Sequence, residues 1–260
     1  MILIDKLAYS SAIRHKSPFL KSAFSVGTLL ICVSARSFVI SLVVLVMMGC
    51  VTIFFSRTSP SHYIKLMIAP FAFLALGTVA IAVNLTDTPM DLLNLPIGSK
   101  YIAVSWFSML YALRLIIVSL ASVSCLYFLI LTTPMMDLFY VMKKLRCPSL
   151  IIEIMMLTYR YIFVLFEMAS SIMTAQNCRL GNISAKSAIN GMGNMLSVIL
   201  IRAMQKANAL FDAMESRCYD GQIRVLYENQ TATIKERLQV GFSLVILAGL
   251  AIWCRFNGGI

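Results

Sequence analysis

The sequence predicts an all-α integral membrane protein, with about five transmembrane helices and a cytoplasmic module of long amphipathic helices. Of the 260 residues, 60% are hydrophobic and 13% are charged. The mean hydropathy of +0.85 is far too high for a soluble domain of ordinary composition. Several long uncharged runs are also followed by a stretch in which apolar residues recur every three or four positions, the period of a helix with one apolar face.

The first two apolar runs predict two consecutive membrane helices. Residues 19–35 carry one charge, Lys21, near the start of the run. This run can cross if the lysine extends to the membrane interface. Residues 37–55 carry no charge and match the roughly 20 residues that a helix needs to cross the hydrocarbon core. Arg36 marks a tight connection between the two.

The next two runs predict spans on either side of a loop. Residues 66–86 are uncharged and include Pro70, which a spanning helix tolerates when neighbouring helices satisfy the freed backbone groups. Residues 87–100 contain two prolines, two acids and one lysine, and predict a loop. Residues 101–131 carry a single charge, Arg114. An arginine at membrane depth is a functional candidate, but near a helix end it can extend to the interface or pair with carbonyls, and we favour this structural interpretation.

The chain changes character between residues 132 and 237. Apolar residues at helical spacing predict an amphipathic helix about 30 residues long, with this face: Ile189, Met192, Leu196, Ile199, Leu200, Ala203, Ala207, Leu210, Phe211 and Met214. We expect the face to pack against another helix of the module or against a partner subunit. The preceding residues 150–166 are nearly as apolar as a span, but Glu153 and Arg160 favour a helix packed on protein or at the membrane boundary. Residues 238–254 are just long enough to cross.

The distribution of lysine and arginine predicts the orientation. Residues 1–21 carry four, residues 57–65 two and residues 132–237 twelve, whereas the opposite side holds Arg36, Lys100 and Arg255. Basic residues concentrate on the cytoplasmic side, so we expect a multi-pass protein of the inner (cytoplasmic) membrane with its N-terminus in the cytoplasm. The predicted domains are a membrane region of about four spans, a cytoplasmic module and a C-terminal span, at 1–135, 136–237 and 238–260.

Other classes of function are poorly supported. The net charge is +11, but the basic residues do not form a tract with exposed aromatics that binds nucleic acid. The motifs GxxxxGK[ST], HExxH and GxSxG are absent, so we expect no catalytic residues and no ATP hydrolysis by this chain. The cytoplasmic acids, Glu153 among them, are interpreted as a solvated or ion-paired helix face. The seven cysteines form no CxxC pair, and His15 and His62 lie far apart, so we expect no metal site and no cofactor.

The most distinctive motif is an alanine followed four residues later by an arginine. It occurs twice, as Ala175–Arg179 and Ala213–Arg217, near the ends of two amphipathic segments. On a helix this spacing puts the alanine one turn before the arginine on the same face, so a cation projects beside uncovered backbone that suits a partner's groove. Gly181 and Gly221 follow as candidate helix stops. An arginine before a glycine also ends many ordinary helices, so a purely structural role stays open.

Together these features resemble the transmembrane T component of energy-coupling factor (ECF) transporters, most closely the cobalt-type CbiQ branch. The resemblance covers nearly the whole chain. Besides the two arginine motifs it rests on shorter matches in the family's order: Ile4–Ser11, Arg14, His15, Pro18, Lys21, Thr133–Pro134, Asp137–Leu138, Leu145–Pro148, Tyr159–Tyr161 and Glu167.

The resemblance implies the energy-coupling subunit of an ATP-driven importer of cobalt or nickel. Its implied partners are the lipid bilayer, two ABC-type ATPase subunits and a separate substrate-binding membrane subunit of the metal-capture type. The implied ATPase-docking residues are Ala175, Arg179, Gly181, Ala213, Glu215, Arg217, Asp220 and Gly221. Leu180 and Cys218 stand where the family usually has glycine, which predicts that the two helices end slightly later, at Gly181 and Gly221.

Three alternatives stay open. The first is the same role in a vitamin-type importer. A gene neighbourhood with a metal-capture subunit or cobalamin-synthesis genes would favour the metal importer over this alternative. The others are a membrane anchor for a peripheral enzyme and an intramembrane enzyme that uses Arg114. A coupling subunit should raise the ATP hydrolysis rate of its partner, whereas an anchor should not.

Overall fold

The computed structural model describes residues 3–11, 13–14, 16–35, 37–56, 59–86, 93–97, 100–104, 106–221, 223 and 233–256. The chain divides into two compact units, one formed by Phe139–Tyr227 and the other by Ile2–Leu138 together with Glu228–Ile260. The predicted connection at Arg36 lies outside the described residues, as do parts of the predicted loops, at 57–58, 87–92 and 98–99, and the stretch 224–232.

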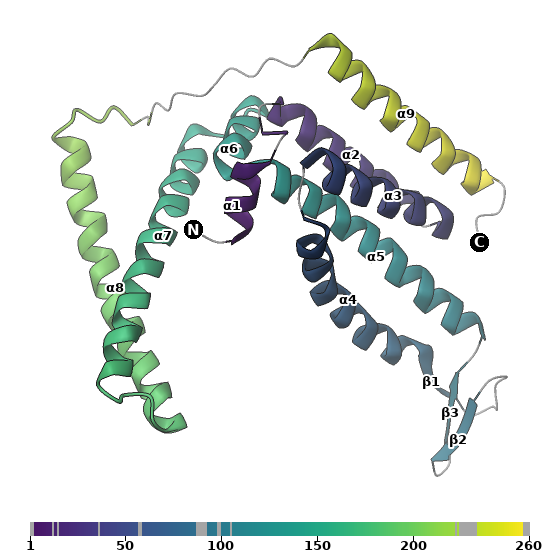
Figure 1. The fold of residues 1–260 in the computed structure, drawn as a ribbon, viewed down its shortest axis with the longest axis horizontal. Coiled ribbons are helices and arrows are strands. Elements are labelled where there is room, and N and C mark those ends of the chain that lie inside the picture. The colour runs from purple at the N-terminus through teal and green to yellow at the C-terminus, as the bar shows by residue number, and fades with distance from the viewer. Residues whose placement is uncertain are drawn as a thin grey trace. The chain divides into compact units, whose positions relative to one another are not determined.

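The larger unit is a set of apolar helices. They are α1 (Leu3–Ser10), α2 (Pro18–Ala35), α3 (Phe38–Cys50), which continues into the π-helical turn η1 (Val51–Phe55), α4 (Pro60–Ala82), α5 (Trp106–Thr132) and α9 (Ile234–Phe256). Helix α5 packs against α2, α3 and α4 (Figure 1). By length and composition α2, α5 and α9 can cross a membrane, while 38–54 forms a shorter apolar helix. The predicted class, an all-α integral membrane protein, is confirmed.

The core of this unit combines small side chains with larger apolar ones. It comprises Cys32, Ile40, Val44, Met48, Ala121, Cys125, Phe128 and Leu247. Ser25 Oγ donates a 2.6 Å hydrogen bond to the Cys125 carbonyl, and the Tyr63 hydroxyl lies 2.7 Å from Ser124 Oγ. Small residues and hydroxyl bonds between helices are typical of packing in a bilayer, where the outer surface stays apolar.

Lys21 is buried against backbone carbonyls. Its side chain is 5% exposed, and Nζ donates to the carbonyls of Ile13, Arg14 and Thr132 at 3.0, 3.4 and 3.1 Å. The ammonium is therefore held by the backbone at this point. The reason is that the ammonium has three donors, and the last turn of α5 leaves carbonyls without an intrahelical partner. Lys21 thus joins the N-terminal segment and the start of α2 to the end of α5.

A small sheet lies between α4 and α5. Strands β1 (Val83–Thr86), β3 (Lys100–Val104) and β2 (Leu93–Ile97) pair in that order, both pairs antiparallel. The sequence predicted helix up to residue 86, a loop, and helix again from 101. These borders were wrong, because apolar and polar residues alternate along 83–86 and along 93–97, a period of two that favours strands. Pro96 lies in β2, an edge strand, where the missing N–H is tolerated.

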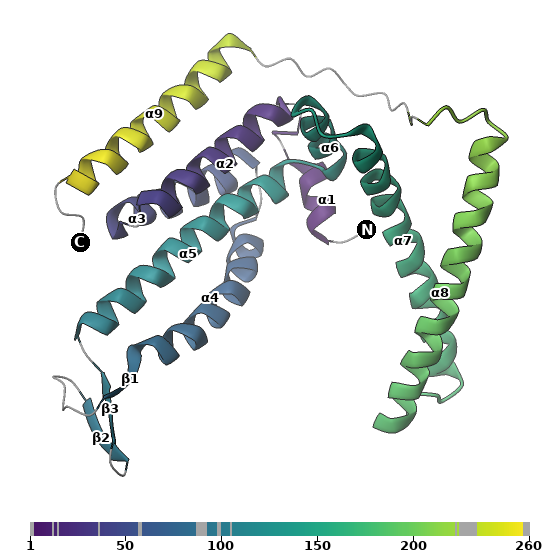
Figure 2. The ribbon, with the colours of Figure 1, turned by 180° about the vertical axis from the view of Figure 1, so that it is seen from behind.

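The smaller unit contains most of α6 (Met135–Lys144), together with α7 (Ser149–Cys178) and α8 (Ala185–Glu215). Phe139 packs edge-on against Tyr159, with ring centroids 6.2 Å apart. Helices α7 and α8 form an antiparallel hairpin, which Figure 2 shows from behind. Helix α7 is itself long and apolar enough to cross a membrane, so the cytoplasmic placement of this unit stays a prediction.

The predicted apolar face of α8 is partly packed within the hairpin. Ile199, Ala203 and Leu210 are half-buried, whereas Leu196 is 59% exposed and Phe211 is 64% exposed. The face therefore packs on α7 over part of its width, and the remainder is open to a partner.

Candidate functional site

The hairpin separates the two alanine–arginine motifs. Arg179 follows the last residue of α7 at the turn into α8, and Arg217 lies just beyond the end of α8. The helices contain 30 and 31 residues, and a rise of ~1.5 Å per residue puts the two ends about 45 Å apart. The motifs therefore belong to two separate sites at opposite ends of one rigid element.

At the first site the chain leaves α7 through a Schellman motif. The Arg179 N–H donates to the Ala175 carbonyl at 3.3 Å, in keeping with the predicted spacing of one turn. The N–H groups of Leu180 and Gly181 then donate to Asn177 and Gln176 at 3.1 and 2.9 Å. These two bonds define the Schellman motif. Leu180 is the left-handed residue, with φ 58°.

Polar contacts then fix the turn that carries Arg179. Gln176 Nε2 donates to the Gly191 carbonyl at 2.9 Å, and Ser187 Oγ donates to the Gly181 carbonyl. Ser184 caps α8 by accepting the Ser187 N–H at 3.2 Å. A Cβ at Gly181 would lie 3.1 Å from the Gln176 carbonyl oxygen, so glycine permits this close approach. The position of Arg179 is consequently set by the turn.

The second site repeats this geometry. Cys218 N–H donates to the Glu215 carbonyl at 2.9 Å and Tyr219 N–H donates to the Met214 carbonyl at 3.1 Å, with Cys218 at φ 56°. One detail differs: the Arg217 N–H bonds to Met214 rather than to Ala213, so the last turn is tighter. Both arginines thus stand immediately before a left-handed residue that ends their helix.

The side chains implied in docking are open to solvent. Ala175, Arg179, Ala213, Glu215, Arg217, Asp220 and Gly221 are exposed, and Gly181 is half-buried. Within the described part of the chain, the side chains of Arg179 and Arg217 make no hydrogen bond or ion pair. Each guanidinium therefore presents its five donors to an external acceptor.

Glu153 joins the start of α7 to the segment that follows Arg217. It is 6% exposed; Oε2 accepts the Tyr219 hydroxyl at 2.7 Å and Oε1 accepts the Ile223 N–H at 2.8 Å. Hydrogen bonding to this carboxylate raises the pKa of Tyr219, because it favours the protonated hydroxyl. The interpretation of Glu153 as part of a solvated or ion-paired face was wrong. Its partners lie about 70 residues away, a separation at which helical periodicity carries no signal.

Glu153→Ala is expected to free the segment that follows Arg217. Hydrogen bonds to a charged group contribute roughly 1.5–3 kcal/mol, so amide hydrogen exchange over residues 219–223 should rise by about ten-fold or more while α8 stays protected. Glu167→Ala is the matched control, because Glu167 is an exposed glutamate on the same helix. Equal exchange in the two variants would show that Glu153 does not hold this segment.

Comparison with known proteins assigns the family. The model of the family "CbiQ: Cobalt transport protein" matches residues 10–228. The chain belongs to the CbiQ family. It is 33% identical over 249 residues to an uncharacterized protein of Methanocaldococcus jannaschii, covering 96% of this chain and 92% of that one. It is 30% identical over 250 residues to the putative fused cobalt transport protein CbiMQ of Methanocorpusculum labreanum, covering 95% of this chain and 41% of the fusion. Identity to the cobalt transport protein CbiQ of Rhodobacter capsulatus is 27% over 247 residues, 95% of both chains.

Membership of the CbiQ family identifies the chain as a membrane component of cobalt transport rather than a catalytic enzyme. The apolar helices agree with a multi-pass membrane protein. Cobalt is cargo in this setting. Among the described residues, no group of three or more His, Cys, Asp or Glu side chains is placed to hold a metal ion.

The two helices end before Gly181 and Gly221. The sequence predicted termination at Gly181 and Gly221, but the left-handed residues are Leu180 and Cys218 themselves, and Gly221 (φ 84°) lies three residues further on. The prediction was wrong because the Schellman bonds set the end point by satisfying the last carbonyls. A side chain in this conformation costs roughly 1–2 kcal/mol, a penalty smaller than the loss of the motif.

Leu180→Gly is therefore expected to stabilise the hairpin by about 1 kcal/mol, since glycine adopts the left-handed conformation without steric cost. Leu180 is 69% exposed, so little packing is lost. Leu196→Gly is the matched control: it truncates another exposed leucine, but inside α8, where glycine should destabilise by about 1 kcal/mol. Denaturant unfolding of the detergent-solubilised chain measures both. A destabilised Leu180→Gly would contradict the strained helix end.

Proposed function

We propose that this CbiQ family chain is the energy-coupling transmembrane subunit of an ATP-driven ECF-type importer for cobalt or nickel. It links two ABC-type ATPase subunits, which hydrolyse ATP, to a separate membrane subunit that binds the metal. The proposed docking residues are Ala175, Arg179 and Gly181 at one end of the hairpin, and Ala213, Glu215, Arg217, Asp220 and Gly221 at the other.

The observation that carries this proposal is the pair of exposed arginines at opposite ends of one hairpin. Two equivalent sites about 45 Å apart suit two copies of one partner. Each small alanine lets partner backbone approach, and the adjacent guanidinium offers planar, bidentate hydrogen bonds to carboxylates in a groove. Because both ends belong to the same pair of helices, a movement of the two ATPases relative to each other would act on the hairpin as a unit.

Three further observations support the arrangement. Twelve basic residues between 132 and 237 favour a cytoplasmic hairpin, on the side where ATP is available, with the N-terminus in the cytoplasm of an inner-membrane protein. The relative named as a putative fused cobalt transport protein CbiMQ is covered over only 41% of its length, which supports a second component beside the CbiQ-type chain. The open part of the α8 face, including Leu196 and Phe211, offers such a partner an apolar surface.

Affinity purification of the tagged chain in mild detergent, with identification of its partners, tests the proposal. We expect two ATPase subunits and a metal-capture membrane subunit. Recovery of a vitamin-binding membrane subunit instead would show that the cargo is a vitamin and would leave the coupling role unchanged. Recovery of a peripheral enzyme without an ATPase would contradict the coupling role and favour an anchor.

A further inference from the structure

A cavity of about 340 Å³ lies among α2, α3, α5 and α9 in the membrane unit. Its body is lined by Leu20, Phe24, Met47, Val51, Phe128 and Val240. The volume falls within the roughly 300–1,000 Å³ of sites that bind small molecules. Because three of these helices are long and apolar enough to cross a membrane, a hydrocarbon chain is the ligand that such a lining favours.

One end of the cavity is polar. Lys16, Ser17, Lys21 and Glu236, which lie near the starts of α2 and α9, line it there, and Gln239 and Ser243 follow along α9. These residues mark one boundary of the membrane unit: α2 begins at Pro18, α9 begins at Ile234, and Lys21 bonds to the last residue of α5. The cavity thus has an apolar body at membrane depth and a polar end at the boundary, the same division as in a phospholipid.

The polar end carries an excess of positive charge. The charged residues that line it are two bases, Lys16 and Lys21, and one acid, Glu236. A cluster of basic side chains at a membrane boundary attracts anionic lipids. The charge of this end therefore selects a negative headgroup over a neutral one.

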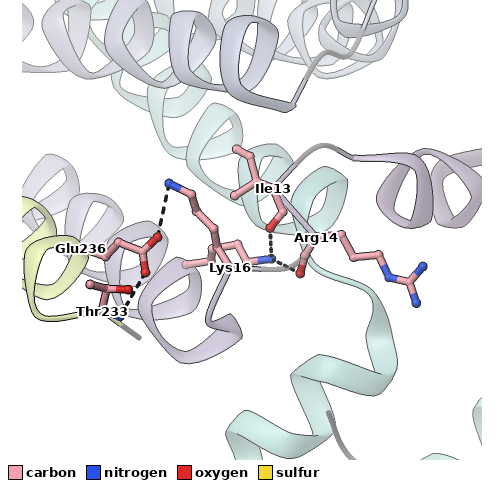
Figure 3. Close-up of polar contacts among 6 residues, drawn as sticks. Ile13, Arg14, Lys16, Thr233 and Glu236 are labelled. Carbon is pink, nitrogen blue, oxygen red and sulfur yellow. Dashed lines mark hydrogen bonds and ion pairs between the residues drawn. The ribbon is translucent and has the colours of Figure 1, made fainter. Parts of the chain in front are cut away.

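Lys16 is the cation best placed to take a headgroup. It lies 3.5 Å from Glu236, with the two side chains 52% and 28% exposed, so this ion pair is reached by water and is weak. Glu236 is also held from its other side, since Oε2 accepts the Thr233 N–H at 3.3 Å in the first turn of α9 (Figure 3). A phosphate bound at Lys16 would therefore leave Glu236 held at the start of its helix.

We propose that this cavity binds an anionic phospholipid, with one acyl chain between α9 and the helices α2, α3 and α5, and with its phosphate held at Lys16. The acyl chain covers apolar surface that water would otherwise contact. The lipid also connects α9 to the rest of the membrane unit.

Native mass spectrometry of the full chain tests this proposal, with phosphatidylglycerol or phosphatidylcholine of identical acyl chains as probes. We expect the wild type to retain one phosphatidylglycerol in preference to phosphatidylcholine. Lys16→Gln should lower phosphatidylglycerol retention about five-fold. Lys186→Gln should leave it unchanged, since Lys186 is an exposed lysine at the start of α8. Val240→Trp, which fills the cavity, should lower retention of both lipids, whereas Leu238→Trp on the exposed side of α9 should not.

Two results would overturn the proposal. In the first, the wild type retains the two lipids equally, and Lys16→Gln and Lys186→Gln retain the same amount of phosphatidylglycerol. This result would indicate bulk lipid only. The other is equal retention by Val240→Trp and Leu238→Trp, which would place the lipid elsewhere. Each variant must first match the wild type in elution and helix content. Ser243→Leu, a smaller change in the same lining, replaces Val240→Trp if that variant does not fold.

Discussion

The double variant Arg179→Glu with Arg217→Glu is expected to abolish co-purification with the ATPase subunits and metal uptake, while membrane insertion stays near normal. Each arginine contributes a charge-assisted hydrogen bond of roughly 1.5–3 kcal/mol at a docked interface. Its loss weakens docking ten-fold or more at each site. Replacing each arginine with glutamate also places a negative charge against partner surfaces that accept a cation, which adds like-charge repulsion. Insertion should survive because neither side chain has a partner among the described residues.

The matched control is Arg160→Glu with Arg202→Glu. These are also exposed arginines, one on each helix of the hairpin, but they lie away from its ends. The control should keep its ATPase partners. If the Arg179 and Arg217 double variant co-purifies normally and supports full metal uptake, the two arginines are ordinary helix caps. If it fails to insert, they are structural.

Lys21→Met is expected to destabilise the membrane unit by about 1–3 kcal/mol. Without the ammonium, the carbonyls of Arg14 and Thr132 lose their donor, whereas Ile13 still accepts the Lys16 N–H at 3.0 Å. The variant no longer buries a cation, and this gain offsets part of the loss. The net destabilisation should therefore stay near the cost of one to two unpaired acceptors. The Tm of the solubilised chain should fall by several degrees.

A thiol-reactive dye measures that Tm, because Cys32 and Cys125 are fully buried in the folded unit. The exposed cysteines are blocked first. Ser22→Ala is the matched control: Ser22 neighbours Lys21 and is similarly buried, but among the described residues its hydroxyl bonds only to the Phe19 carbonyl within α2. A Lys21→Met chain that melts with the wild type would show that the three carbonyl bonds contribute nothing net.

Much of the fold could be predicted because a bilayer permits few solutions. An uncharged run such as 37–55 can satisfy its backbone groups only as a helix or within a closed barrel, and helical spacing then placed Arg179 and Arg217 at helix ends. Contacts between distant segments were not predictable in this way. Lys21 bonds to Thr132 across 111 residues and Glu153 to Tyr219 across 66, and no local pattern encodes either pair.

The helix ends show a subtler limit. Glycine preference predicted Gly181 and Gly221, yet Leu180 and Cys218 take the left-handed conformation. Composition alone gives the intrinsic preference of a residue, whereas the carbonyls of Gln176 and Met214 determine where the chain turns. The strands between α4 and α5 were missed for a related reason, since short apolar runs do not distinguish strand from helix by hydropathy.

The coupling role is tested most directly by the ATP hydrolysis rate of the purified ATPase subunits in lipid nanodiscs, measured with and without this chain. The account predicts that the wild-type chain, assembled with its substrate-binding subunit, raises the rate, and that the Arg179→Glu and Arg217→Glu chain does not. The Arg160→Glu and Arg202→Glu chain should raise it as the wild type does. An unchanged rate with the wild-type chain stably bound to the ATPases would contradict energy coupling.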